Sequence, residues 1–276
     1  MAPDSRFPQV RHRLLFGGAV CLLVVSAIRT TGAATLEPRT LHAYKAYLAI
    51  AVERFSNRGS DGVFLWTDER PDRRQAVREG RIIVEPASED GILDVPGGLI
   101  HHWTGAGFLE GVGLEDALRI VQAYGDYPRI HPPIVQAELI ERTGDTARVF
   151  IRLRKSTRFV TAVFDVWWNI RYYYPGDDRA YSRSNVERVV QVMNAGRSDE
   201  HQLAEGTGGG YLWAANTFSR FLERDGGTYI EFQTLALSRG FPRLLGWIAE
   251  PIARRVGAGS VADTLSELRD AAEATR

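Results

Sequence analysis

The chain has 276 residues, 44% of them hydrophobic, and its 34 basic residues balance its 34 acidic residues. A chain of this size can bury one large core, or one core with a small addition. The charge balance lacks the basic excess of nucleic-acid-binding proteins, so we expect no nucleic-acid partner. Its single cysteine is Cys21. If the N-terminal segment is removed, disulfides, cysteine nucleophiles and thiolate metal sites are excluded.

Residues 1–34 have the pattern of a secretory signal peptide. The basic stretch Arg11–Arg13 precedes an apolar run, Leu14–Ile28, and small residues follow at Gly32 and Ala34. The run is shorter than the roughly 20 residues that a membrane-spanning helix needs. The sequence therefore predicts a secreted or periplasmic protein. Retention as an uncleaved membrane anchor is the alternative.

Residues 35–97 predict a small N-terminal appendage of helix and strands. Apolar residues at helical spacing predict a helix over 36–55. Two short apolar runs, 62–68 and 80–86, predict strands, and the polar segment 69–79 between them predicts a solvated loop. About 60 residues are too few to ensure a core of their own.

From residue 98 onward the pattern predicts one domain, 98–276. A strand at 99–110 is followed by a helix and a proline-rich bent connection over 113–133. Turn residues then separate six strands into three hairpins, which predicts an antiparallel meander over 133–142, 147–154, 157–174, 180–193, 210–224 and 228–238.

The end of the chain predicts a long helix from residue 241 that Pro251 and the glycines at 257 and 259 interrupt. Beyond the break, Ser260 and Asp263 form a capping box. A buried stripe follows at Val261, Leu265, Leu268 and Ala272. This helix has to cover the concave face of the curved sheet, because no other large apolar surface is predicted. The expected fold class is α+β, with an antiparallel sheet of about seven strands wrapped on the C-terminal helix.

This order resembles the helix-grip fold of the START-like (SRPBCC) superfamily, which includes polyketide cyclase and coenzyme Q-binding relatives. The resemblance covers residues 98–272. "LEDALRIVQAYGDYPRIHPPIVQAELIER" is similar to the family's helix, bent linker and second strand. "GGGYLWAANTFSRFLERDGGTYIEFQTLALSRGFP" and "LLGWIAEPIARR" are similar to the last hairpin and gripping helix of secreted, uncharacterised bacterial members. The resemblance implies a cavity between sheet and helix that holds an apolar small molecule, and it supplies no set of catalytic residues.

The adjacent histidines His101 and His102 do not predict a metal site. Neighbours in a strand point to opposite faces, so the two rings cannot converge on one ion. His101 shares a face with Trp103, while His102 shares the other face with Ile100 and Thr104. We interpret the histidines as structural, with His102 as a polar anchor in the cavity wall as the alternative. No metal or cofactor is predicted.

The glycine-rich stretch 205–213 does not predict a phosphate site either. It lacks the lysine and hydroxyl of a phosphate-binding loop and leads into a strand. Its glycines are more typical of a bent strand or a cavity rim.

The ligand-binding candidates come from strands whose two faces both mix apolar and polar side chains. Apolar area with a few polar groups is what a small-molecule site needs. Ordinary core packing explains Asp165, Asn216, Arg220 and Glu231 equally well. The predicted ligand-binding residues are His102, Trp103, Phe164, Asp165, Trp167, Trp213, Asn216, Phe218, Arg220, Glu231 and Trp247.

The expected function is binding or transport of a lipid or other hydrophobic small molecule, released by opening at 128–133 or 241–256. Arginines at 239, 243, 254 and 255 suggest contact with an anionic membrane surface, although a solvated helix face is the commoner explanation. The alternative is a cyclase/aromatase-like or hydrolytic enzyme that uses a cavity carboxylate or histidine. A third interpretation is an interaction domain whose interior is filled by side chains.

Overall fold

One antiparallel sheet holds most of the strands. The computed structural model describes residues 34–60, 62–156, 161–240 and 246–275, with only the backbone at 60 and 246–249. Within these residues ten strands form the sheet. They are β2 (Ile83–Pro86), β3 (Ile92–Val95), β4 (Gly98–Glu110), β5 (Ile134–Thr143), β6 (Thr146–Ser156), β7 (Thr161–Gly176), β8 (Arg179–Met193), β9 (His201–Gln202), β11 (Ala214–Arg224) and β12 (Gly227–Arg239).

The strand order is β2-β4-β12-β11-β8-β7-β6-β5, with β3 also paired to β4 and β9 to β8. The sequence predicts the long strands of this order, β4 to β8 with β11 and β12. It does not predict the short strands β3 and β9. A separate pair joins β1 (Ala34–Thr35) to β10 (Thr207–Gly208). The expected α+β class and antiparallel meander are confirmed.

The β11–β12 hairpin shows how turn chemistry sets the register. Asp225 and Gly226 both have positive φ, 58° and 77°. A two-residue turn of this kind has the twist that antiparallel strands require, and it favours Asp-Gly. Arg224 consequently pairs with Gly227, and the pairing continues along the hairpin to Ala214 and Leu237.

The pairing sorts side chains onto two faces of the sheet, because directly paired residues share a face. Trp103, Ile230 and Phe221 cluster with the C-terminal helix, and we call their face the inner face. His102 and Glu231 lie on the opposite side, which we call the outer face.

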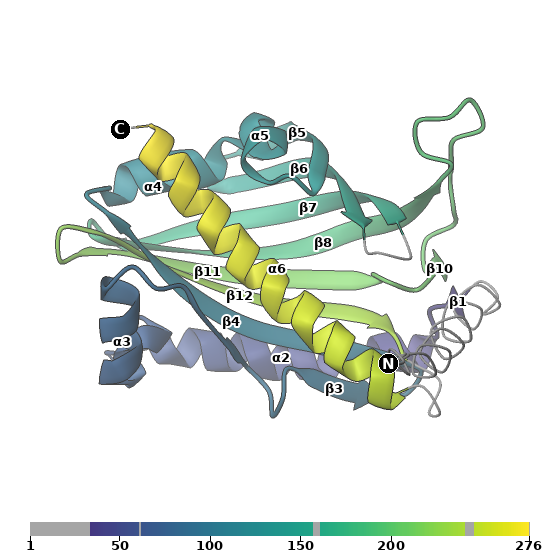
Figure 1. Cartoon of the computed structure of the whole chain (residues 1–276), viewed down its shortest axis with the longest axis horizontal. Coiled ribbons are helices and arrows are strands. Elements are labelled where there is room, and N and C mark those ends of the chain that lie inside the picture. The colour runs from purple at the N-terminus through teal and green to yellow at the C-terminus, as the bar shows by residue number, and fades with distance from the viewer. Residues whose placement is uncertain (1–33, 61, 157–160, 241–245, 276) are drawn as a thin grey trace, which may run out of the picture. The chain divides into compact units, whose positions relative to one another are not determined.

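The C-terminal helix α6 (Gly246–Ala274) crosses the inner face diagonally, as Figure 1 shows. Its predicted stripe, Val261, Leu265, Leu268 and Ala272, is buried in the main core cluster. The helix lies chiefly against β4, β2, β12 and α4 (Leu114–Gln122). The expected helix-on-sheet arrangement is therefore confirmed.

The predicted interruption of this helix is wrong, because α6 runs unbroken through Pro251 and Gly257. A proline near the start of a helix removes one backbone hydrogen bond without ending the helix. Gly257 allows Trp103 to approach the helix closely, because a Cβ at this position would lie 2.5 Å from Trp103 Nε1. The glycine lets the tryptophan ring pack against the helix backbone.

Gly105 sets the close approach of α6 to β4. A Cβ on Gly105 would lie 2.6 Å from Val261 and 2.9 Å from Leu265. Gly107 has room, because the nearest atom to its Cβ would be 3.7 Å away. We therefore expect Gly105→Ala to lower the free energy of unfolding by about 1–3 kcal/mol, as overpacking does. Gly107→Ala should cost clearly less in the same urea titration. Equal losses in the two variants would contradict this seating of the helix.

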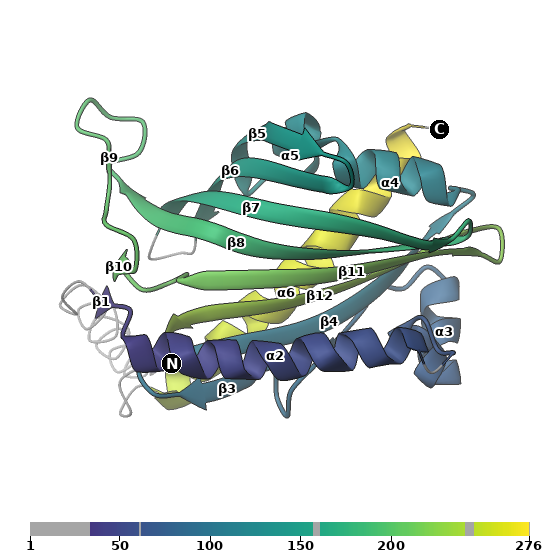
Figure 2. The same cartoon turned by 180° about the vertical axis from the view of Figure 1, so that it is seen from behind.

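The helix α2 (Pro38–Ser60) lies along the outer face, as Figure 2 shows from behind. Phe55 packs on Phe218 with ring centroids 5.0 Å apart, and Tyr44 donates a hydrogen bond to the Leu235 carbonyl at 3.1 Å. Residues 35–97 thus add a second helical layer, and their strands β2 and β3 join the sheet.

Two local predictions in this segment are wrong. Residues 62–68 hold no strand: Trp66–Glu69 form a 3₁₀ turn, η1, and Phe64, Leu65 and Trp66 pack in a cluster with Phe108 and Tyr229. The expected loop at 69–79 contains α3 (Pro71–Arg78), whose Pro71 suits the first helical position. The bent connection is three short pieces: α4, η2 (Tyr124–Asp126) and α5 (Tyr127–Ile130).

The predicted signal peptide lies outside the described residues. In the described part, no helix combines the length and apolar character needed to cross a membrane.

Candidate functional site

The inner face carries a group of small hydroxyl side chains where β8, β11 and β12 run side by side. Ser182 and Ser219 are directly paired across β8 and β11 and are only 5% and 9% exposed. Thr217 donates a hydrogen bond to Ser184 at 3.0 Å. Within the described residues the Ser182 and Ser219 side chains have no hydrogen-bond partner. Buried hydroxyls usually have one, so this pair is available to a ligand or water.

Apolar side chains surround these hydroxyls on the same face. Phe232 pairs with Ser219, and Tyr172 pairs with Ser182. Further along β7, Trp168 joins a cluster with Phe164 and Val166. The inner face therefore combines aromatic area with a few hydroxyls, which is the composition of small-molecule sites.

The helix α6 is not seated on this part of the sheet. Its extensive contacts are with β4, β2 and β12, and not with β11, β8 or β7. Two polar contacts tie it to the far side: Lys155 Nζ donates to Ser260 Oγ at 3.1 Å, and His131 Nδ1 lies 2.6 Å from Glu267 Oε2. Contacts thus hold α6 on both sides of this cluster of hydroxyl side chains.

The sequence-predicted residues divide between the two faces. Trp103 and Phe164 lie on the inner face. Eight others lie on the outer face or pack from that side, away from α6: His102, Asp165, Trp167, Trp213, Asn216, Phe218, Arg220 and Glu231. These eight do not line the space beneath α6. The side chain of Trp247 lies outside the described residues. Whether any of the eleven binds a ligand stays a prediction.

Glu231 is the centre of a polar cluster beneath α2. It is 1% exposed, accepts a hydrogen bond from the Trp66 backbone N–H at 2.6 Å and forms an ion pair with Arg58. Arg220 lies directly opposite Glu231 and donates to the Phe55 carbonyl. Burial first, then the positive charges of Arg58 and Arg183, lower the pKa of Arg220 to about 10, although Glu231 opposes them. The cluster fastens α2, η1 and the sheet together.

His102 belongs to the same interface. Its Nδ1 lies 2.9 Å from the Tyr47 hydroxyl of α2, and Gln233 donates to its Nε2. Both ring nitrogens therefore contact neutral partners. Burial and then the charge of Arg54 lower the pKa of His102 to about 4. On the other face, His101 bonds Ser238 at 2.8 Å, and burial lowers its pKa to about 4.

Asp165 is held in an ion-pair group of its own. Both carboxylate oxygens accept from Arg152, at 2.7 and 3.0 Å, and Gln202 donates to one of them at 2.7 Å. Both oxygens of the carboxylate are therefore already hydrogen-bonded within the protein. Nearby, Trp167 packs on Phe150 with centroids 5.3 Å apart, and Arg188 covers its ring. Both predicted residues therefore have structural partners.

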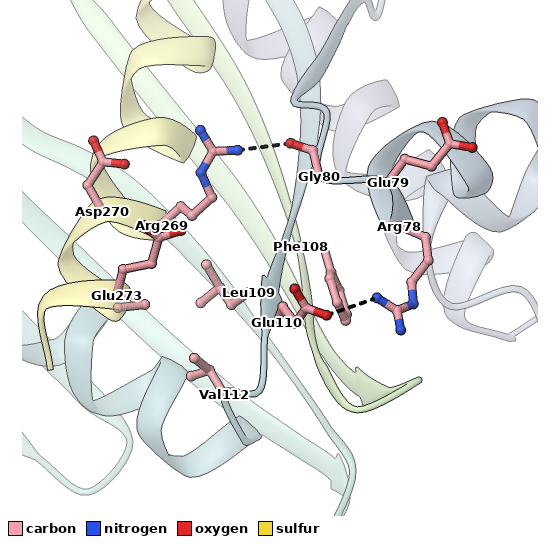
Figure 3. A pocket seen from close by; sticks show the side chains of 11 residues that line it. Arg78, Glu79, Gly80, Phe108, Leu109, Glu110, Val112, Arg269, Asp270 and Glu273 are labelled. Carbon is pink, nitrogen blue, oxygen red and sulfur yellow. Dashed lines mark hydrogen bonds and ion pairs between the residues drawn. The ribbon is translucent and has the colours of Figure 1, made fainter. Parts of the chain in front are cut away.

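A surface pocket of about 420 Å³ lies between the end of α3, the end of β4 and the last turns of α6 (Figure 3). Arg269 donates to the Gly80 carbonyl at 2.9 Å, and Arg78 lies 4.0 Å from Glu110. Its lining includes none of the predicted site residues. No group of three or more metal-ligating side chains occurs within the described part of the chain.

Two observations define the architecture. A strand, a helical connection and a six-strand meander follow one another along the chain, and α6 then packs closely on Gly105. The chain has a helix-grip fold. The N-terminal layer of α2 on the outer face is an addition to it.

Comparisons with known proteins find similarity only at low sequence identity. No family model matches the chain, and no curated protein matches it. A solved STAR-related lipid transfer protein from Xanthomonas axonopodis is similar over 66% of this chain and 99% of its own, with 16% identity and a TM-score of 0.45. Human STARD10 is similar over 66% and 75%, with 9% identity and a TM-score of 0.40. Zhui aromatase/cyclase from Streptomyces covers 63% and 94%, with 12% identity and a TM-score of 0.40.

Sequence reasoning missed the residues that best mark a site in this helix-grip fold. Ser182 and Ser219 alternate with larger side chains in "AYSRSN" and "NTFSRF", and such small residues on one face were the available signal. The His131–Glu267 contact joins residues far apart in the chain, and no local spacing indicates it.

Proposed function

We propose that the protein binds a hydrophobic or amphipathic small molecule between the inner face of the sheet and α6. The observation that carries the proposal is the buried pair Ser182 and Ser219, which have no hydrogen-bond partner in the described residues and lie among aromatic side chains. Neither hydroxyl oxygen is among the completely buried atoms that lack a partner, so each can hydrogen-bond to water or to a polar group of a bound molecule.

The apolar part of the ligand supplies most of the affinity. Burial of apolar surface stabilises by about 25 cal/mol per Å², so a tail that buries about 200 Å² gains about 5 kcal/mol. Trp168, Phe232 and Tyr172 would provide this surface, and the serines would fix the orientation.

Carriage is favoured over catalysis by where the acid–base candidates lie. Asp165, Glu231 and His102 are on the outer face and bonded to Arg152, Arg58 and Tyr47. None of the three lies on the inner face. The titratable side chains on that side, His101 and the pair His131 and Glu267, are bonded to Ser238 and to each other. The interaction-domain interpretation requires the space under α6 to be filled by side chains, and it predicts that no molecule co-purifies with the protein.

Uptake or release of the ligand would require α6 to move away from α5 and β6. His131–Glu267 and Lys155–Ser260 are the contacts on that side, and they join α6 to the end of α5 and to β6. The predicted opening at 128–133 coincides with the first of them. The other predicted opening, 241–256, falls partly outside the described residues.

The test is native mass spectrometry with organic extraction of the purified full chain and of Ser219→Phe. We expect the wild-type protein to carry a co-purified apolar molecule. Ser219→Phe should remain folded, because the new ring takes the ligand's place, and should lose the bound mass. Ser219→Ala is the matched control, since it keeps the space and should retain at least part of the ligand. Collapse of Ser219→Phe, or equal occupancy in both variants, would exclude this site.

We also propose that residues 1–34 direct export of the protein to the periplasm or out of the cell, where it binds its ligand. The support is the basic, apolar and small-residue pattern of that segment. We propose that Arg255 contacts the membrane surface. Arg254 already pairs with Asp90 and Glu250, and Arg243 lies outside the described residues. The intact mass of the protein recovered from the cell envelope tests cleavage, and an uncleaved chain would contradict it.

A further inference from the structure

The outer face carries a ladder of three matched pairs on β7 and β8. Asn169 pairs with Asn185, Arg171 with Arg183 and Tyr173 with Tyr181. The two strands present the same residue types in opposite chain order, Asn-x-Arg-x-Tyr on β7 and Tyr-x-Arg-x-Asn on β8. Directly paired residues share a face. We call these six residues the Asn-Arg-Tyr ladder.

The ladder is accessible beside α2. In Figure 2, β7 and β8 lie next to the strands that α2 follows and are not covered by it. Asn185 and Arg171 are exposed, and the other four are half-buried. Contact with α2 is limited to one edge, where Arg183 donates to Ser56 at 2.5 Å and Tyr181 meets Phe55.

The arginine pair is the unusual part of the ladder. Like charges directly opposite each other in a sheet are destabilising. In the described part of the chain, neither Arg171 nor Arg183 forms an ion pair with a carboxylate, and Arg183 Nε is buried without a partner. The nearest carboxylate with a contact to the ladder is Glu187, which is shared by Asn169 and Arg148. The positive charge of the pair is therefore not neutralised by the protein.

Both guanidinium groups of the ladder lie near one tyrosine ring. The Arg171 and Arg183 guanidinium carbons lie 5.2 and 6.0 Å from the centre of the same Tyr173 ring. Tyr173 is stacked on Tyr181, with centroids 4.5 Å apart and planes within 9°. Two arginine forks beside amide donors form a group suited to an oxyanion, since guanidinium binds phosphate through paired hydrogen bonds.

We propose that the Asn-Arg-Tyr ladder binds a phosphate group, with Arg171 and Arg183 contacting its oxygens and Asn185 donating at its side. The site is on the opposite face of the sheet from the hydrophobic ligand, so it does not depend on the proposed function. The phosphate belongs either to a soluble phosphate ester or to a lipid headgroup.

The test compares the full-length wild-type chain with Arg171→Gln and with Arg119→Gln as control. Arg119 is an exposed arginine of α4 that pairs with Glu115 and Asp116 and, within the described residues, forms no hydrogen bond or ion pair with the ladder. Glycerol phosphate is titrated at constant ionic strength by calorimetry, and vesicles of phosphatidylglycerol or phosphatidylcholine are tested by co-sedimentation. We expect Arg171→Gln to weaken binding at least tenfold and Arg119→Gln to bind like wild type.

Binding of glycerol phosphate identifies a soluble source, and binding only to phosphatidylglycerol vesicles identifies a headgroup. Both outcomes support the site if Arg171→Gln abolishes them. A second measurement is the melting temperature without phosphate, which should be equal or higher in Arg171→Gln because the repulsion is relieved. Failure of the wild type to bind either probe, or equal binding by Arg171→Gln, would overturn the proposal.

Discussion

Replacing Glu231 with alanine is expected to lower the free energy of unfolding by about 3–5 kcal/mol, the usual cost of removing one partner of a buried ion pair. The carboxylate is 1% exposed and neutralises Arg58 while it accepts from the Trp66 backbone. Without it, Arg220 loses the nearby negative charge of Glu231, and Arg58 keeps only its ion pair with the partly exposed Glu69. Urea denaturation of both proteins measures the difference.

Glu110→Ala is the matched control for this experiment. Its side chain is 78% exposed and lies 4.0 Å from Arg78. Exposed pairs contribute about 0–1 kcal/mol, so this variant should unfold close to the wild type. If Glu231→Ala were no less stable than Glu110→Ala, the cluster would not be what holds α2 on the sheet.

Lowering the pH from 7 to 5 is expected to destabilise the protein through its buried histidines. Burial and the charge of Arg54 lower the pKa of His102 to about 4, against an ordinary value of 6.5. Between these two values the unfolded chain binds a proton that the folded chain does not. The free energy of unfolding therefore falls as the pH drops below 6.5, and His102 accounts for about 2 kcal/mol of loss by pH 5.

His102→Gln isolates this contribution, because glutamine keeps hydrogen-bonding groups and does not titrate. The stability lost between pH 7 and pH 5 should shrink by about 2 kcal/mol in this variant. The matched control is His42→Gln, since His42 lies exposed on α2. An unchanged pH dependence in His102→Gln, or an equal change in His42→Gln, would show that His102 is protonated normally in the folded chain.

The sequence predicts which residues share a face of the sheet, but it cannot tell which face meets α6. His101 and His102 lie on opposite faces as expected, opposite Ala236 and Leu235. Alternation along a strand shows which residues share a face, but not which helix that face meets. In this protein a helix packs on each face of the sheet. Because α2 covers the outer face, Glu231 lies under that helix and does not line the space beneath α6.

Contacts between distant segments account for the other differences. Pro251 and Gly257 predict a break by local propensity, yet tertiary packing against Trp103 uses the glycine within a continuous helix. Ser182 and Ser219 read as ordinary strand hydroxyls until the pairing of β8 with β11 places them together. The fold was predictable because turns and periodicity are local, whereas the site depends on register and on the position of α6.

The measurement that tests the central claim most directly is photo-crosslinking of a diazirine-labelled fatty acid to the full chain, followed by peptide mapping. Attachment should occur on β8, β11 or the inward side of α6, and should disappear in Ser219→Phe. Attachment to α2, or labelling that Ser219→Phe leaves unchanged, would mean that no ligand occupies the space between α6 and the serine pair.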